Sequence, residues 1–142
     1  MRHNVFGRKL SRDVKERKAL FKNLISALVL EEKIRTTEAK ARAIRSLAEK
    51  LVTRAKAGTV AARRQIASFL IHKETARKLV DVIAPRFISR PGGYTRIIKL
   101  GRRTGDNAEE VMMEWVDHGK VAEASKTQSV KDTKTKKEEK KK

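Results

Sequence analysis

Residues 13–58 read DVKERKALFKNLISALVLEEKIRTTEAKARAIRSLAEKLVTRAKAG, and their apolar side chains recur at intervals of three and four. Such spacing places the apolar residues on one face of a helix. It predicts a first helix over residues 14–30, begun by Asp13 with Glu16 reaching back to the cap. A second helix is expected from Thr36 or Thr37, as its cap, to Gly58. The β-branched run Ile34–Thr37 between them favours an extended link or a short strand.

The chain beyond residue 58 changes from helical to strand-like patterns. Thr59 can cap a third helix that runs to about Leu70. A fourth is expected from about Lys73 to Ile83, with Pro85 preventing its continuation. Residues 94–100 and 111–116 alternate like strands, and the Gly, Asp and Asn of residues 101–107 suit a hairpin connection. We therefore predict an α+β fold, with about four helices packed in two layers on a small, mostly antiparallel sheet.

The aromatic side chains are expected in the core. Trp115 shares a strand face with Val111 and Met113, whereas Glu110 lies on the opposite face. Phe21 lies on the apolar stripe of the first helix. A base-stacking platform usually exposes two or more aromatic residues. The hairpin has only Tyr94 and Trp115, so packing is the preferred interpretation.

Charge sets the class of partner. The 142 residues contain 36 Lys and Arg against 17 Asp and Glu, a formal +19. Residues 120–142 hold nine Lys and four acids, so residues 1–119 keep 27 basic against 13 acidic residues. So large an excess repels itself unless a polyanion neutralises it, and nucleic acid is the usual polyanion. The folded part is therefore expected to bind nucleic acid by itself.

The two ends differ in composition from the middle. Residues 1–12 carry four cations, no acid and few apolar residues, so we expect a basic arm that orders against RNA. Residues 120–142 have too few apolar side chains to form a core, which predicts a disordered Lys-rich tail. The predicted division is an RNA-binding domain over 1–119, with its arm at 1–12, and a tail over 120–142.

No pattern of catalytic, metal-binding or membrane-spanning residues stands out. The chain has no cysteine, and His3, His72 and His118 lie far apart without ligand-like spacing. Adjacent acids such as Glu31 and Glu32, or Glu109 and Glu110, point away from each other and are interpreted as solvated charges. No apolar run reaches the roughly 20 residues that span a bilayer, and no signal peptide begins the chain. A cytosolic protein without enzymatic activity, cofactor or small-molecule substrate is predicted.

Two basic regions are candidate RNA contacts on their residues alone. Lys18 belongs to the basic face of the first helix, where few acids are available as partners. In the loops around residues 90–105, glycines allow backbone to approach a phosphate, and Arg90, Arg102 and Arg103 can clamp it. The alternative is that these are ordinary turns flanked by exposed arginines, but the total charge favours the phosphate interpretation.

Several segments together resemble the family of bacterial large-subunit ribosomal protein seventeen. They span about residues 1–118 in family-like order and spacing. Their sequences are MRH (1–3), GRKL (7–10), RKALFKNL (17–24), IRTT (34–37), KA (40–41), RF (86–87), GGYTRI (92–97), GDNA (105–108) and EWVD (114–117).

This resemblance implies a structural protein of the large subunit that binds its ribosomal RNA near the exit side of the peptide tunnel. It also implies neighbouring ribosomal proteins, among them the zinc-ribbon-type protein numbered thirty-two. The RNA-facing residues that it implies are Arg2, His3, Arg8, Lys9, Arg12, Arg17, Lys40, Arg86, Arg90 and Arg96.

Two other functions remain open on the sequence. A DNA-compacting protein would also be small, basic and free of cysteine, but such proteins commonly insert an apolar wedge that is not obvious here. A small RNA-modifying enzyme would need an acid–base or nucleophile constellation, and none is found.

Overall fold

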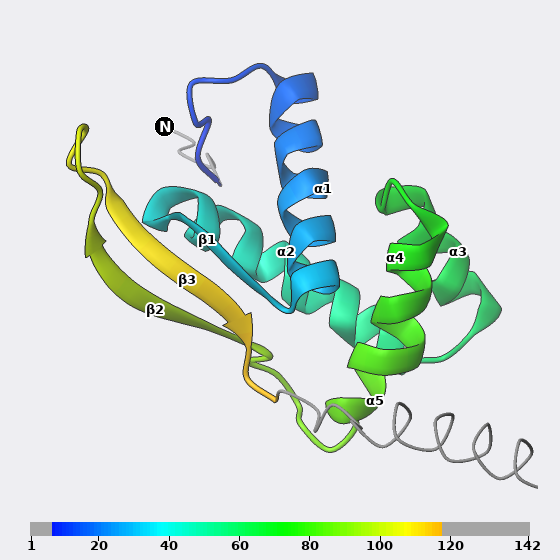
Figure 1. Cartoon of the computed structure of the whole chain (residues 1–142). Coiled ribbons are helices and arrows are strands. Elements are labelled where there is room, and N and C mark those ends of the chain that lie inside the picture. The colour runs from blue at the N-terminus through cyan, green and yellow to red at the C-terminus, as the bar shows by residue number, and fades with distance from the viewer. Residues whose placement is uncertain (1–6, 118–142) are drawn as a thin grey trace, which may run out of the picture.

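The computed structural model describes residues 7–117, which form four helical stretches and three strands (Figure 1). The first half contains α1 (Val14–Glu31), β1 (Lys33–Thr37), α2 (Glu38–Lys56) and α3 (Val60–Phe69). The second half contains one helical stretch made of α4 (Lys73–Arg77), η1 (Lys78–Ile83) and α5 (Ala84–Arg86), then β2 (Thr95–Arg102) and β3 (Glu109–Trp115). Residues 1–6 of the predicted basic arm (1–12) and the whole predicted tail (120–142) lie outside the described residues. Within residues 7–117, no helix is long and apolar enough to cross a membrane.

The three strands form one antiparallel sheet in the order β1-β3-β2. Residues 34–37, for which a link was the alternative, belong to a strand, and Ile34 and Ile97 flank Met113 across the sheet. α2 contacts all three strands and also α1, α3, η1 and α5. Figure 1 shows the sheet and the α3–α4 pair at opposite ends of α2. The predicted α+β fold, with helices packed on a small antiparallel sheet, is confirmed.

Trp115 joins the sheet to α1. Its side chain is fully buried, and its indole N–H donates a hydrogen bond to the carbonyl oxygen of Leu28 at 3.1 Å. The Phe87 ring lies 5.2 Å from that of Tyr94 and 6.2 Å from that of Trp115, between ring centroids. The expectation that Trp115 and Tyr94 pack in the core is confirmed, whereas Phe21 is only partly buried against the core.

The helix starts agree with the predicted positions, but their capping differs. Asp13 and Thr37 occupy the N-cap positions of α1 and α2, and neither side chain makes a capping hydrogen bond. The predicted start of the first helix at Asp13 is therefore confirmed, while the reach of Glu16 back to the cap stays a prediction. Thr59 does cap α3, because its hydroxyl accepts from the N–H of Ala62 at 3.2 Å. α2 ends at Lys56, and Gly58 adopts the positive φ of +65° that the turn into α3 requires.

The prediction that Pro85 ends the fourth helix is wrong. The helix widens into the π-helical η1, in which the N–H of Ala84 bonds to the carbonyl of Leu79, five residues earlier. Pro85 lies at the second residue of α5, directly after this wider turn, and has no N–H to donate to the preceding turn. The wider π turn changes the register of the hydrogen bonds just before the proline. The chain therefore stays helical to Arg86, and Phe87 reaches the core.

Gly101 is part of a strand instead of the predicted hairpin connection. β2 continues to Arg102, and the pairing of β2 with β3 shifts between Lys99 and Gly101. Gly101 has φ +119°, a conformation that glycine adopts readily and that is common at a β-bulge. The connection is therefore shorter than expected, and both strands reach further into it.

Replacing Thr59 by alanine should lower the free energy of unfolding by about 1 kcal/mol, because it removes the side-chain cap of α3. Chemical denaturation of the two proteins measures the difference. Thr59→Ser keeps the hydroxyl and should stay close to the parent. Thr104→Ala, in an exposed loop, controls for the loss of a threonine; a loss as large as that of Thr59→Ala would contradict the capping role.

Candidate nucleic-acid interface

The chain before α1 folds back towards α1 and α2 and lines a groove with them, which we call the arm groove. The groove has a volume of about 370 Å³. Four cations lie along it, Arg8 and Lys9 from the arm, Arg17 from α1 and Lys50 from α2. The other lining residues are Gly7, Phe21, Ala43, Ser46 and Leu47. A groove with an apolar floor and cationic walls suits a polyanion with a phosphate backbone.

The four cations of the arm groove are not matched by carboxylates of the described residues. Within residues 7–117, none of them forms an ion pair. Three of them, Arg8, Lys9 and Arg17, were predicted from the sequence. Lys50 was not, although Ala43, Leu47 and Lys50 follow one another at helical spacing on α2. That spacing was the available signal.

A tight turn connects the arm to α1. The N–H of Arg12 bonds to the carbonyl of Lys9 at 3.3 Å, and Leu10 and Ser11 have φ of +56° and +50°. Side chains other than glycine rarely adopt this backbone conformation. The Arg12 guanidinium folds onto the Leu10 carbonyl at 3.2 Å, so Arg12 does not line the arm groove.

The remaining predicted cations of the first half are scattered. Lys18 is exposed on α1 next to Arg17, and Lys40 is half-buried in the first turn of α2. Neither lines the arm groove. Arg2 and His3 lie outside the described residues.

Arg86 is used inside the fold. Its two terminal nitrogens donate to the two carboxylate oxygens of Glu32 at 2.8 and 2.9 Å, and the side chains are only 15% and 21% exposed. Glu32 is the C-cap of α1 and has φ +63°. The interpretation of Glu32 as a solvated charge is therefore wrong. A bidentate pair of this kind ties the end of α1 to the end of α5.

The Gly-Gly-Tyr turn carries two arginines in more exposed pairs. Arg90 lies 3.3 Å from Asp117, and Arg96 lies 3.5 Å from Glu114. The Lys56 amine donates to the Arg90 carbonyl at 2.6 Å and holds the turn in place. The Arg90–Asp117 pair is exposed and contributes little, so the Arg90 guanidinium can exchange its carboxylate for a phosphate. Glu114 is nearly buried, so Arg96, which is itself about half exposed, can contact a phosphate only while it stays beside that carboxylate.

The outer face of the sheet is a charge network that the sequence did not reveal. Glu110 and Glu114 of β3 are only 9% and 8% exposed, although they point away from the helices. Arg35 of β1 donates through Nε to Glu110 at 2.8 Å, and Arg103 also approaches Glu110. The interpretation of Glu110 as a solvated charge is wrong, because the central strand is covered by arginine side chains from its neighbours.

The two arginines of the hairpin loop, Arg102 and Arg103, differ in whether a carboxylate already binds them. Arg103 forms a bidentate pair with Asp106, at 3.0 and 2.6 Å. This hydrogen bonding raises the pKa of Arg103 and lowers the pKa of Asp106 to about 2. Arg102 is exposed and forms no ion pair within residues 7–117. Of the two, Arg102 is the one available to a phosphate.

Acidification should release Arg103 from Asp106 only at very low pH. The folded pKa of Asp106 is lowered from 3.8 to about 2, so the pair stabilises the loop above pH 4 and is lost as pH falls through about 2. The carboxyl chemical shift of Asp106, followed by NMR, should titrate near 2. A midpoint near the ordinary aspartate value would show that the pair does not form in solution, and Asp106→Asn gives the reference spectrum of the unpaired loop.

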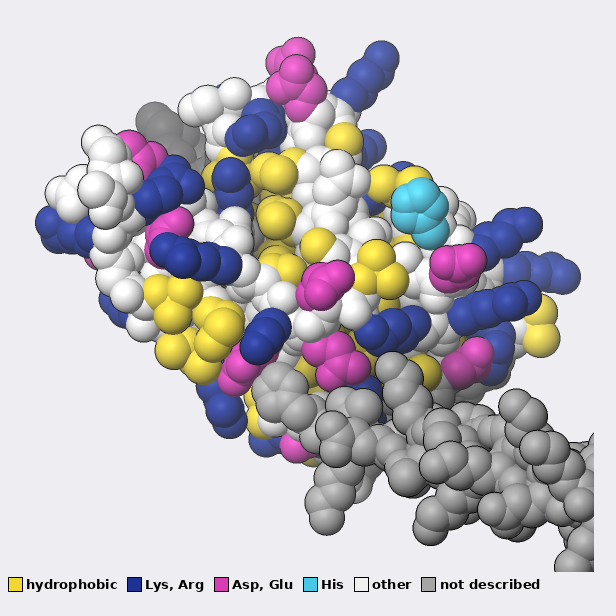
Figure 2. Space-filling view, in the orientation of Figure 1, with side chains coloured by type: hydrophobic (Ala, Val, Ile, Leu, Met, Phe, Trp, Pro, Cys, Tyr) yellow, Lys and Arg dark blue, Asp and Glu magenta, His cyan; other side chains and the backbone are white. Residues whose placement is uncertain are grey.

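The histidines and acids of the described residues do not form a candidate metal centre. No group of three or more His, Asp or Glu there is placed to hold a metal ion. His72 is exposed at the start of α4, and His3 and His118 lie outside residues 7–117. Figure 2 shows cationic side chains interspersed with acids over the visible face, and a dense group of cations at the α3–α4 end.

Comparison with known proteins identifies relatives over most of the chain. A family model described as ribosomal protein L17 matches residues 20–116. The chain is 49% identical over 117 residues to large ribosomal subunit protein bL17 of Geobacter metallireducens, covering 82% of this chain and 66% of that protein. It is also 49% identical over 117 residues to bL17 of Trichlorobacter lovleyi, covering 82% and 94%. For bL17 of Syntrophotalea carbinolica the identity is 45% over 117 residues, covering 82% and 76%.

Proposed function

Because the chain belongs to the ribosomal protein L17 family, a family of structural proteins without enzymatic activity, we propose that it binds and stabilises large-subunit ribosomal RNA. The observation that carries this proposal is the arm groove, where four cations without an ion pair within residues 7–117 line one hollow. The formal charge of +19 on the whole chain also indicates a nucleic-acid partner, because a polyanion must neutralise so large an excess.

The proposed mechanism is recognition of RNA shape and phosphate. The phosphate backbone of the RNA would lie along the arm groove. Arg8 and Lys9 of the arm would contact it from one side, and Arg17 of α1 and Lys50 of α2 would contact it from the helices. Contacts to phosphates fix position and register without reading sequence. Each phosphate that is neutralised releases counterions, so binding weakens as salt rises.

The other predicted contacts enter the proposal in two groups. Lys18, Lys40 and Arg102 have no ion pair within the described residues and need only approach a phosphate. Arg90 and Arg103 must first leave exposed carboxylates, whereas Arg96 would contact a phosphate while it stays beside the nearly buried Glu114. For Arg86 we propose an indirect role, holding α1 and α5 while neighbouring backbone meets RNA. We also propose that Arg2, His3 and Arg12 of the arm contact the RNA.

The proposal also includes the surroundings of the protein. The motif resemblance supports a place in the ribosome of the bacterial cytoplasm, near the exit side of the peptide tunnel. It also supports contact with the ribosomal protein numbered thirty-two. The relatives are named large ribosomal subunit proteins, which is the reason for preferring the large subunit.

A DNA-compacting protein is the rival to exclude. Ile88, which is 70% exposed in the basic loop after α5, is the kind of side chain that such proteins insert between base pairs. The test is the affinity of the full chain for large-subunit ribosomal RNA and for duplex DNA over a range of salt. We expect tighter binding to the RNA at every salt concentration, and co-sedimentation with large subunits from a lysate. Equal affinity for duplex DNA, or recovery with chromosomal DNA, would overturn the proposal.

A further inference from the structure

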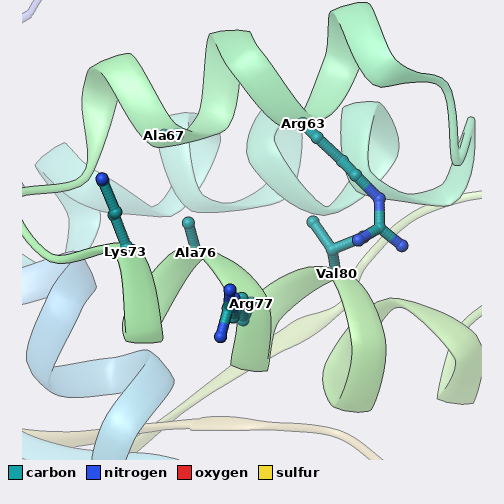
Figure 3. Close-up of a pocket in the computed structure, with 6 residues that line it drawn as sticks. All are labelled: Arg63, Ala67, Lys73, Ala76, Arg77 and Val80. Carbon is teal, nitrogen blue, oxygen red and sulfur yellow. The ribbon is translucent and has the colours of Figure 1, made fainter.

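A second hollow lies between α3 and α4, at the opposite end of α2 from most of the sheet (Figures 1 and 3). It has a volume of about 270 Å³ and is lined by Arg63, Ala67, Lys73, Ala76, Arg77 and Val80. We call it the α3–α4 slot. None of these residues was among the predicted contacts.

The slot exists because small side chains face each other across it. Ala67 of α3 and Ala76 of α4 lie on facing sides, and Val80 lines one end (Figure 3). Ala76 and Val80 are buried, whereas Ala67 is exposed. The helices contact each other, but methyl groups at these positions leave the space between them unfilled. The result is an apolar slot open to solvent.

Cations mark the ends and the mouth of the slot. Lys73 extends towards α3 at one end, and Arg63 extends towards Val80 at the other (Figure 3). Within residues 7–117, Lys73 and Arg77 form no ion pair, and Arg63 pairs with Asp81 at 2.9 Å with both side chains about half exposed, at 52% and 48%. An exposed pair of this kind is weak, so all three cations can serve a bound anion.

The chemistry of the slot matches a nucleotide. Its apolar walls suit the face of a base, its arginines suit stacking on that base, and its cations suit the attached phosphate. A partner helix would need a longer groove with anchors at several successive turns. At about 270 Å³ the slot is also smaller than the roughly 300–1,000 Å³ typical of sites for larger small molecules. A single base therefore fits the slot better than a partner helix or a larger small molecule does.

We propose that the α3–α4 slot holds one unstacked nucleotide of the bound RNA, with the base against Ala67, Ala76 and Val80 and the phosphate beside Lys73 and Arg77. This inference rests on the proposed function and deepens it, because it gives the protein a contact with a specific nucleotide besides the arm groove. RNA recognition commonly uses bases that are splayed out of loops and bulges.

Filling the slot tests the proposal. Ala67→Met places a longer apolar side chain where the base would lie, on an exposed helix position that tolerates methionine. With large-subunit ribosomal RNA as the probe, we expect a roughly tenfold weaker affinity, the scale of one lost base–protein stack, and an unchanged salt slope. Chemical probing should lose one base protection and keep the others. Ala61→Met, on an exposed position of α3 outside the slot, is the matched control and should behave as the parent.

The cations give an independent readout. Lys73→Gln and Arg77→Gln together should lower the salt slope by about 0.7 for each phosphate contact, whereas Arg64→Gln, exposed on α3 outside the slot, should leave it unchanged. Because the chain has no cysteine, Ala67→Cys can carry a single photo-crosslinker. We expect that crosslinker to attach to one site in the RNA, and attachment to a ribosomal protein would overturn the proposal.

Free nucleotide and RNA can be distinguished in the same assay. Adenosine monophosphate alone should bind the slot only in the millimolar range, and micromolar binding would assign the slot to a small molecule instead. Parental affinity and protections in Ala67→Met would overturn this inference alone. A parent chain without preference for ribosomal RNA over DNA would overturn the proposed function as well.

Discussion

Replacing Trp115 by alanine is expected to lower the free energy of unfolding by about 3–5 kcal/mol. The side chain is fully buried, contacts the Phe87 ring and donates its only N–H to Leu28 of α1. Alanine would leave a cavity between the sheet and the helices and would remove the indole hydrogen bond to the Leu28 carbonyl. Since small domains are stable by only about 5–15 kcal/mol, this single change should bring the chain close to unfolding at physiological temperature.

Denaturant midpoints by circular dichroism measure this loss. Trp115→Phe is the informative control, because it keeps most of the apolar volume while it removes the hydrogen bond to Leu28 and leaves only a small cavity. It should cost clearly less than alanine. A loss below about 1 kcal/mol for Trp115→Ala would mean that α1 and the sheet do not depend on this contact, and the packing described for the core would be wrong.

The parts of the fold that could be predicted are those encoded locally. Apolar spacing located α1 and α2 within one or two residues, and alternation along residues 111–116 identified the buried face that carries Trp115. Thr59 gave the start of α3. Each of these signals depends on neighbours within about four positions in the chain, which a sequence displays directly.

The parts that could not be predicted depend on partners distant in the chain. Arg35 and Glu110 are 75 residues apart, and Glu32 and Arg86 are 54 apart. Their pairing appears only once the strand order β1-β3-β2 and the end of α5 are known. The path through Pro85 was missed for a related reason, since a π turn is a rare response to a proline and has no simple local pattern.

The candidate interface was only partly predictable for the same reason. Counting charges indicated a polyanion, but it could not separate cations that face solvent from those already matched by acids. The structure brings Arg8, Lys9 and Arg17 together with Lys50, while it pairs Arg86 inside the fold. Net charge identifies the class of partner, and only the arrangement of acids identifies which cations can reach it.

Replacing the four cations of the arm groove, Arg8, Lys9, Arg17 and Lys50, by glutamine is expected to weaken binding to large-subunit ribosomal RNA by roughly 100-fold at moderate salt. Each lost phosphate contact removes a counterion-release contribution of about 0.7–0.9 from the salt slope, so the slope should fall by about 3. None of the four forms an ion pair within residues 7–117, so the substitution leaves no acid unmatched and stability should change little. Filter binding over a range of salt, with denaturation as a check of folding, measures both quantities.

A second variant with the same change in net charge separates local geometry from total charge. Replacing Lys134, Lys136, Lys137 and Lys140 by glutamine also removes four positive charges, all of them from the Lys-rich residues 120–142. If the RNA follows the arm groove, the groove variant should lose more affinity and more slope than this one, and it should lose protections of specific nucleotides that this one keeps. If the two variants weaken binding equally, the attraction is a property of the whole chain's charge, and the cations of the groove have no special role. The comparison is decisive because four charges at fixed positions on a rigid fold can match a set of phosphates, whereas four charges counted anywhere can only raise the average attraction.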